Sequence, residues 1–257
     1  MDAARHLEIV RTEGERLAAM PADALGAPIP TIDGWDVEKV VRHVGNVHAW
    51  VTGALALGPD QTMDDIPRLE PMPKGPACLD GYRDRLDEMV AAFEARDPDE
   101  PCLNFAGQGS VGWWMRRQAQ EVSVHRVDVQ DGVHAAGGPA PDLLAVDGAA
   151  DGIDEWASFF LAIRFGQRFD RLPATLDGRS IHVHGTDDPA PADGAEWLLR
   201  FADGSVEVER THAKGDVALR GAAPDLLLAL WRRRPLESVD VLGDRSVIDT
   251  LLDAARF

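Results

Sequence analysis

The chain has 257 residues, of which 44 are acidic and 26 are basic, and its formal net charge is −18. This balance argues against a nucleic-acid partner and against docking on an anionic membrane, because both depend on clustered Lys and Arg. Hydrophobic residues make up 45% of the chain, enough for a packed core. The chain has no apolar run of the length that a membrane span needs, no signal-peptide pattern at its start, and no CxxC spacing around Cys78 or Cys102. We therefore expect a soluble, cytoplasmic, acidic globular protein without disulfide bonds.

Helical periodicity dominates the first part of the chain. Apolar residues recur at helical spacing in residues 3–20, in a segment that begins near residue 37, and in residues 78–96. Asp33 or Asp36 could cap the second of these helices. Further helices are predicted over residues 113–129 and 142–165. The segments 59–76 and 97–112 are rich in Pro, Gly and acidic residues and are predicted to be loops, the second with a short strand at 102–105.

The pattern changes after residue 167. Short β-type runs at 180–184, 196–201 and 206–210 are separated by turns, and two helices are predicted at 224–233 and 245–255. Helices followed by strands that alternate with helices are typical of an α+β chain with two domains. We predict a helical domain over residues 1–168 and a small α/β domain over residues 169–257.

A carboxylate and an imidazole lie four residues apart in the predicted helix 113–129. Glu121 and His125 would share one face of this helix, a turn apart, where both could bind one divalent ion. Gln118 lies on the same side one turn earlier, and Asp128 could orient the His125 ring by accepting a hydrogen bond from it. Because an ordinary surface pair has the same spacing, the pattern alone leaves both alternatives open.

A third ligand could come from the helix that begins near residue 37. His43 falls among its valines, three residues after Val40 and four before Val47, so we expect the His43 side chain to face the interior. His48 lies five positions further on, about 140° around the helix, so both histidines cannot approach one ion. The alternative for His43 is a buried imidazole bonded to a backbone carbonyl or a carboxylate.

Two other groups are interpreted as structural. His182 and His184 alternate on a predicted strand and share one of its faces, but no third ligand is evident near them. Cys102, in the loop before the helix 113–129, is interpreted as a small apolar filler rather than a reactive thiol.

Several segments, in the same order along the chain, resemble one known family. Residues 35–44 (WDVEKVVRHV) resemble the Trp–Val–His signature of DinB-like bundles, and especially that of the actinobacterial mycothiol-dependent maleylpyruvate isomerase family. Residues 121–128 are similar to its second metal-ligand segment, and residues 149–156 to the acidic helix that follows. Residues 184–187 and 196–197 resemble the start of its C-terminal domain. The resemblance implies a DinB-like four-helix bundle followed by a small α/β domain.

By this resemblance, His43, Glu121 and His125 would be the protein ligands of a divalent metal, most often zinc. Two imidazoles and a carboxylate leave coordination positions open, as in catalytic zinc sites, although iron, nickel or manganese accept the same donors. Zinc with an open position would lower the pKa of a bound thiol, which would then react as a thiolate. The family implies that this thiol is mycothiol.

The resulting hypothesis is a metal-dependent isomerase or thiol transferase that acts on a small electrophile such as maleylpyruvate, as a monomer or a homodimer. The alternative is a non-catalytic protein of the same fold that binds a metal or a thiol conjugate. A third possibility is a bundle that holds no metal. The physiological substrate stays open, because DinB-like scaffolds share this ligand triad among different reactions.

Overall fold

The computed structural model describes residues 1–58, 60–105, 107–162, 171–192 and 194–255. Its contacts divide the chain into two compact units, Met1–Leu143 and Leu144–Phe257. The predicted boundary at residues 168/169 lies outside the described residues, as does the end of the predicted helix 142–165. The α-helical part of that segment, α5 (Val146–Glu155), belongs to the second unit, where it packs against α6 (Ala223–Leu230).

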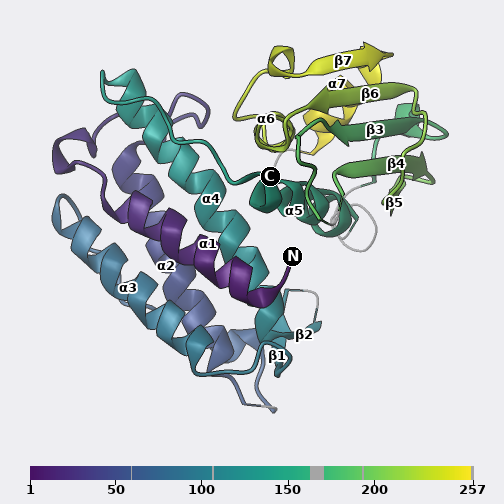
Figure 1. The fold of residues 1–257 in the computed structure, drawn as a ribbon. Helices are drawn as coiled ribbons and strands as arrows, with labels where there is room; N and C mark the ends of the chain where they lie inside the picture. The colour runs from purple at the N-terminus through teal and green to yellow at the C-terminus, as the bar shows by residue number, and fades with distance from the viewer. Residues whose placement is uncertain (59, 106, 163–170, 193, 256–257) are drawn as a thin grey trace. The chain divides into compact units, whose positions relative to one another are not determined.

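The helices of the first unit form the predicted four-helix bundle (Figure 1). They are α1 (Ala3–Ala18), α2 (Val37–Leu55), α3 (Ala77–Glu94) and α4 (Val111–Ala135), with short 3-10 helices at Ala22–Ala24 and Met63–Asp65. α1 and α2 each pack against both α3 and α4, which closes the bundle. Of the two predicted caps, Asp36 caps α2 by accepting a 2.8 Å hydrogen bond from the backbone N–H of Lys39.

The core of the bundle is built around the valines of α2. Val37, Val41, Val44 and Val51 are completely buried, as the helical spacing predicts. Each such side chain stabilises the fold by about 1.5–3 kcal/mol through burial. The other helices contribute the larger fully buried side chains Leu17, Tyr82, Met89, Phe93, Trp114 and Arg126.

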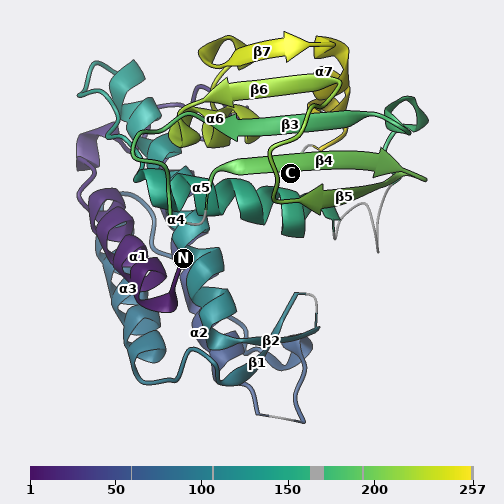
Figure 2. The same cartoon turned by 45° about the vertical axis from the view of Figure 1, so that its right-hand side comes forward.

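A short hairpin precedes α4. Its strands, β1 (Pro101–Asn104) and β2 (Gly107–Ser110), pair antiparallel (Figure 2). The strand predicted at 102–105 is thus present with slightly different bounds, but the glycine-rich segment after it is its partner and not a loop. A Cβ at Gly109 would collide with the Asn104 side chain, so a larger residue there would require Asn104 to shift. The Ser110 hydroxyl caps α4 by accepting a 3.3 Å hydrogen bond from the N–H of Trp113.

A five-stranded mixed sheet organises the second unit, in the order β5-β4-β3-β6-β7 (Figures 1 and 2). β3 and β6 are parallel, and the other neighbouring strands are antiparallel. The sequence does not predict β6 or β7. The strands are β3 (Ser180–Gly185), β4 (Glu196–Ala202), β5 (Ser205–Glu209), β6 (Val217–Gly221) and β7 (Asp240–Gly243).

Helices accompany this sheet. α5 continues into a π-helical turn at Trp156–Leu161, α6 follows β6, and α7 (Arg245–Ala254) follows β7, with 3-10 helices at Ala174–Leu176 and Leu236–Ser238. The residues of β3 alternate between the two faces of the sheet. Ile181 and Val183 are buried on one face, whereas His182 and His184 project from the other.

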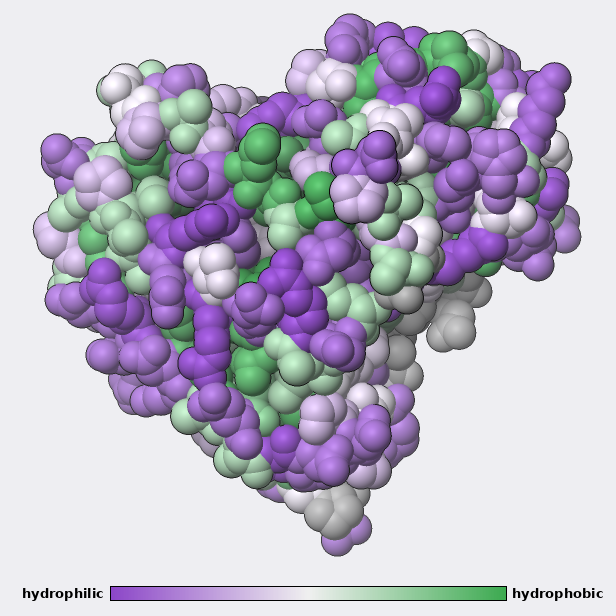
Figure 3. Space-filling view, in the orientation of Figure 1, coloured by the Kyte–Doolittle hydropathy of each residue, from purple (hydrophilic) through white to green (hydrophobic). Residues whose placement is uncertain are grey.

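The surface shown in Figure 3 is mainly hydrophilic, with hydrophobic residues interspersed between polar ones. This distribution agrees with the large excess of acidic residues in the chain. No helix in the described part of the chain combines the length and the apolar character needed to cross a membrane.

Candidate metal centre

Two helices of the bundle bring three potential ligands together. α4 presents Glu121 and His125 on one face, one turn apart, and α2 presents His43 opposite them. The Glu121 Oε1 atom lies 3.3 Å from the His43 Nε2 atom and 3.4 Å from the His125 Nε2 atom. One ligand atom from each residue lies within 4.8 Å of the other two. Residues 78 positions apart in the chain therefore converge at one carboxylate oxygen.

The His43 side chain is more exposed than its place among the valines predicts. It is 39% exposed, whereas Glu121 and His125 are 15% and 14% exposed. The buried stripe of α2 instead passes through His48, which lies four residues after Val44 and is completely buried. The expectation that His43 faces the interior holds only in part: His43 lies at the edge of this stripe, where its ring contacts Glu121 and His125 of α4 but is not fully buried. The cluster is therefore partly exposed at His43 and largely buried at Glu121 and His125.

Asp128 lies where the sequence predicts, next to the His125 ring. Its buried carboxylate accepts a hydrogen bond from His125 Nδ1 over 2.9 Å. Because Nδ1–H is committed to Asp128, Nε2 is the nitrogen directed toward Glu121 and His43, and it is the one that would bind a metal once it has lost its proton. Gln118 is buried on the same helix, and its Oε1 atom has no hydrogen-bond partner among the described residues.

Arg117 is the residue that the sequence interpretation missed. Its guanidinium donates to the Oε2 atom of Glu121 from one turn earlier on α4, and it is itself nearly buried. The i, i+4 spacing of the two residues could have indicated this pair. Because Arg117 holds Oε2, the Oε1 atom is left for the two imidazoles or for a metal.

Charge pairing within the cluster outweighs burial. Burial alone would raise the pKa of Glu121, but the nearby His125 and Arg117 hold it well below its usual value. Burial alone would lower the pKa of His125, but the Glu121 charge and the Asp128 hydrogen bond raise it to about 9. Without a metal, the two residues thus form an ion pair, and metal binding has to release the His125 proton.

The donor set fits a divalent metal of the zinc class. Zinc accepts both imidazole nitrogen, a borderline ligand, and carboxylate oxygen, a hard one. The three donors number one fewer than a four-coordinate ion requires. The aromatic rings around the cluster pack edge to face: the His43 ring centroid lies 5.4 Å from that of Trp35 and 5.1 Å from that of His125.

The cysteines do not contribute to this cluster. Cys78 is buried, and burial raises the pKa of its thiol to about 11. Burial also raises the pKa of the Cys102 thiol. Both thiols are therefore protonated at neutral pH, in agreement with the interpretation of Cys102 as a filler.

The comparisons with known proteins point to one family. The model of the mycothiol maleylpyruvate isomerase N-terminal domain matches residues 7–130, and that of the MDMPI C-terminal domain matches residues 147–250. No match was found among curated proteins. The structure of the mycothiol-dependent maleylpyruvate isomerase aligns with a TM-score of 0.56 at 11% identity, and that of a histidine-to-alanine mutant with 0.58 at 12%. Each alignment covers 94% of this chain and 93% of the other, and shows a shared fold. With both domains matched in order, the chain belongs to the mycothiol-dependent maleylpyruvate isomerase family.

Proposed function

We propose that the chain is a divalent-metal-dependent enzyme, with zinc as its metal, that activates a low-molecular-weight thiol for reaction with a small electrophile. The observation that carries this proposal is the convergence of His43, Glu121 and His125 at a partly exposed point. Three protein donors with room for a further ligand are typical of catalytic zinc sites, whereas structural sites are closed. The two solved structures that align with this chain are titled as the mycothiol-dependent maleylpyruvate isomerase and a mutant of it. Mycothiol is therefore the proposed thiol, and maleylpyruvate or a related electrophile the proposed substrate.

A divalent metal held there would lower the pKa of a coordinated thiol, so that a thiolate forms at neutral pH. The chain's own residues prepare its ligands. Asp128 keeps the Nδ1 proton of His125 in place, and Arg117 holds one oxygen of Glu121, so that each ligand presents a single free donor atom.

The proposed isomerisation needs no other reactant. The thiolate forms a C–S bond at one carbon of an activated double bond, whose electron pair moves onto the activating group. The resulting single bond rotates, and the electron pair returns to restore the double bond in its isomerised form as the C–S bond breaks and the thiolate leaves. With a saturated electrophile that carries a leaving group, the same thiolate would displace that group and remain attached, which is the transfer reaction. In both reactions the nucleophile is the bound low-molecular-weight thiol, so neither Cys78 nor Cys102 is needed.

The proposal is tested with the full chain and three variants. The metal content is measured after purification, and turnover of maleylpyruvate is followed chromatographically with mycothiol, with cysteine and with no thiol. Glu121→Gln and His43→Ala should each lose one equivalent of metal and lose thiol-dependent turnover by at least about 100-fold. His134→Ala is the matched control, because His134 lies exposed near the end of α4 and, among the described residues, its ring bonds only to the Gly138 carbonyl.

Two results would contradict the proposal in different ways. If Glu121→Gln and the wild type bind the same amount of metal, the cluster is not a metal site. If the variants lose metal that the wild type holds, but the wild type turns over no electrophile with any thiol, the chain is a binding protein of the same fold and not an enzyme.

A further inference from the structure

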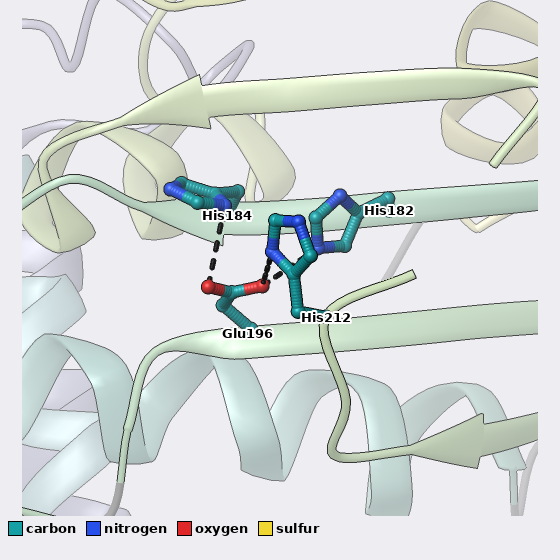
Figure 4. A group of neighbouring side chains, drawn as sticks. All are labelled: His182, His184, Glu196 and His212. Carbon is teal, nitrogen blue, oxygen red and sulfur yellow. Dashed lines mark hydrogen bonds and ion pairs between the residues drawn. The ribbon is translucent and has the colours of Figure 1, made fainter. Parts of the chain in front are cut away.

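A second group of histidines gathers in the C-terminal unit. His182 and His184 project from one face of β3, and the sequence alone indicates a structural pair. The structure adds two more residues to this pair: Glu196, which lies opposite His184 in the register of β4, and His212, in the segment that connects β5 to β6. Figure 4 shows the three imidazoles directed toward the Glu196 carboxylate.

The four side chains surround a common point. Glu196 Oε2 lies 3.1 Å from His182 Nε2 and 2.5 Å from His212 Nδ1, and Glu196 Oε1 lies 3.4 Å from His184 Nδ1. One ligand atom from each of the four lies within 4.8 Å of all the others. A tetrahedral zinc ion with ligands at about 2.0–2.1 Å keeps its donor atoms roughly 3.4 Å apart, which is the scale of this cluster.

The orientation of the rings supports convergence rather than stacking. The centroids of the three imidazoles are 5.5, 5.2 and 5.6 Å apart, and the ring planes meet at 85°, 88° and 74°. Stacked histidines would have nearly parallel rings, and their nitrogens would not meet. Nearly perpendicular rings allow one nitrogen of each imidazole to face the same centre (Figure 4).

The cluster includes a residue of the segment 210–216, which connects β5 to β6. β5 and β6 are separated in the sheet by β4 and β3, so the segment 210–216 has to cross both strands. Its ends are attached by an ion pair of 2.8 Å between Arg210 and Asp154 and by a hydrogen bond of 3.0 Å from the Asp216 N–H to the Ser180 carbonyl. Between these ends, His212 reaches back to the sheet.

We propose that His182, His184, Glu196 and His212 form a second divalent-metal site, of the zinc class, which fastens the segment 210–216 to the sheet. Three imidazoles and a carboxylate complete a four-coordinate set without a solvent ligand. The proposed role is therefore structural, and it does not depend on the function proposed for the helical unit.

The test uses the full chain with Glu121→Gln, so that the cluster of the helical unit does not contribute metal. After chelation and dialysis, the protein is titrated with Co²⁺, whose visible absorption reports tetrahedral coordination, and with Zn²⁺. One equivalent should bind, and Zn²⁺ should raise the melting temperature of the protein. Adding His212→Ala should weaken binding by at least tenfold and abolish this rise, whereas adding His134→Ala should change neither.

A cysteine at position 212 distinguishes coordination from an indirect effect on folding. His212 is 73% exposed, so its replacement should not disturb the core. His212→Cys in the same background should still bind Co²⁺ and should add a thiolate-to-metal charge-transfer band. The proposal is overturned if the Glu121→Gln protein binds no metal, if His212→Ala binds Co²⁺ with unchanged affinity and spectrum, or if His212→Cys produces no such band.

Discussion

His48 gives the bundle a defined sensitivity to acid. Its side chain is completely buried in the stripe of α2, and neither ring nitrogen has a hydrogen-bond partner among the described residues. The nearest aromatic ring is that of Tyr82, with centroids 5.4 Å apart. Burial lowers the pKa of His48 from 6.5 to about 3, against the smaller opposing effect of the Glu121 charge.

The sign of the effect follows from proton linkage. Between about pH 6.5 and pH 3 the unfolded chain binds a proton at His48 that the folded chain does not, so the free energy of unfolding falls as the pH falls. At about 1.4 kcal/mol per pH unit, the full difference amounts to about 5 kcal/mol. Because the titration begins near the unfolded pKa, about 3 kcal/mol of this is lost between pH 7 and pH 4.

The perturbation is His48→Leu. It replaces two unpartnered nitrogens by apolar atoms, so the free energy of unfolding at pH 7 should stay the same or rise. At pH 4 the variant should have lost about 3 kcal/mol less than the wild type. Urea unfolding at both pH values, followed by far-UV circular dichroism, measures the difference, with the exposed His134→Ala as control. Equal pH dependence of His48→Leu and the wild type would refute the reasoning, because His48 would then titrate alike in the folded and unfolded chain.

Three further predictions follow from other buried polar groups of the bundle. Asp128→Asn should weaken metal binding at the cluster of the helical unit by about 10–100-fold, because it disturbs the tautomer of His125. Competition with a chromophoric chelator measures the metal affinity, and an unchanged affinity would contradict the prediction. Glu13→Gln should lower the free energy of unfolding, measured by urea unfolding, by about 3–5 kcal/mol, because it leaves the buried Arg126 without its 2.5 Å ion pair. A loss below about 1 kcal/mol would show that this ion pair is dispensable. Tyr82→Phe should change that free energy by less than about 1 kcal/mol, because the buried hydroxyl has no partner among the described residues, and a larger loss would reveal one.

The helices of the bundle could be predicted because their evidence is local. The valines of α2 repeat at helical spacing from Val37 to Val51, and Asp36 marks the point at which the helix begins. β6 and β7 offer no such repeat. They are five and four residues long. β6 is a strand because it pairs with β3, with Val217 opposite Ile181, and β7 is a strand because it pairs with β6. A strand that depends on a partner far away in the sequence cannot be predicted from its own residues.

The site residues also divide into those that local spacing predicts and those that depend on the packing of the bundle. Glu121, His125 and Asp128 occupy one helix, so their spacing alone places them together. The choice of His43 over His48 also placed the correct residue beside Glu121, although for a partly wrong reason, since His48 is the one that faces the core. Which edge of α2 meets α4 depends on the packing of the bundle, and helical spacing carries no information about it.

The two clusters differ in the number of donor atoms that they can offer to a metal. In the helical unit, Arg117 takes one oxygen of Glu121, so the cluster can offer two imidazoles and a single carboxylate oxygen. In the C-terminal unit, both oxygens of Glu196 face histidines, and the cluster has a fourth donor. An ion held by three donors has to complete its shell with a small molecule and can therefore activate one, whereas an ion held by four gains nothing by exchanging a protein ligand for a thiol. The number of donors, and not the identity of the metal, is thus the property from which we infer reactivity for the first cluster and a structural role for the second.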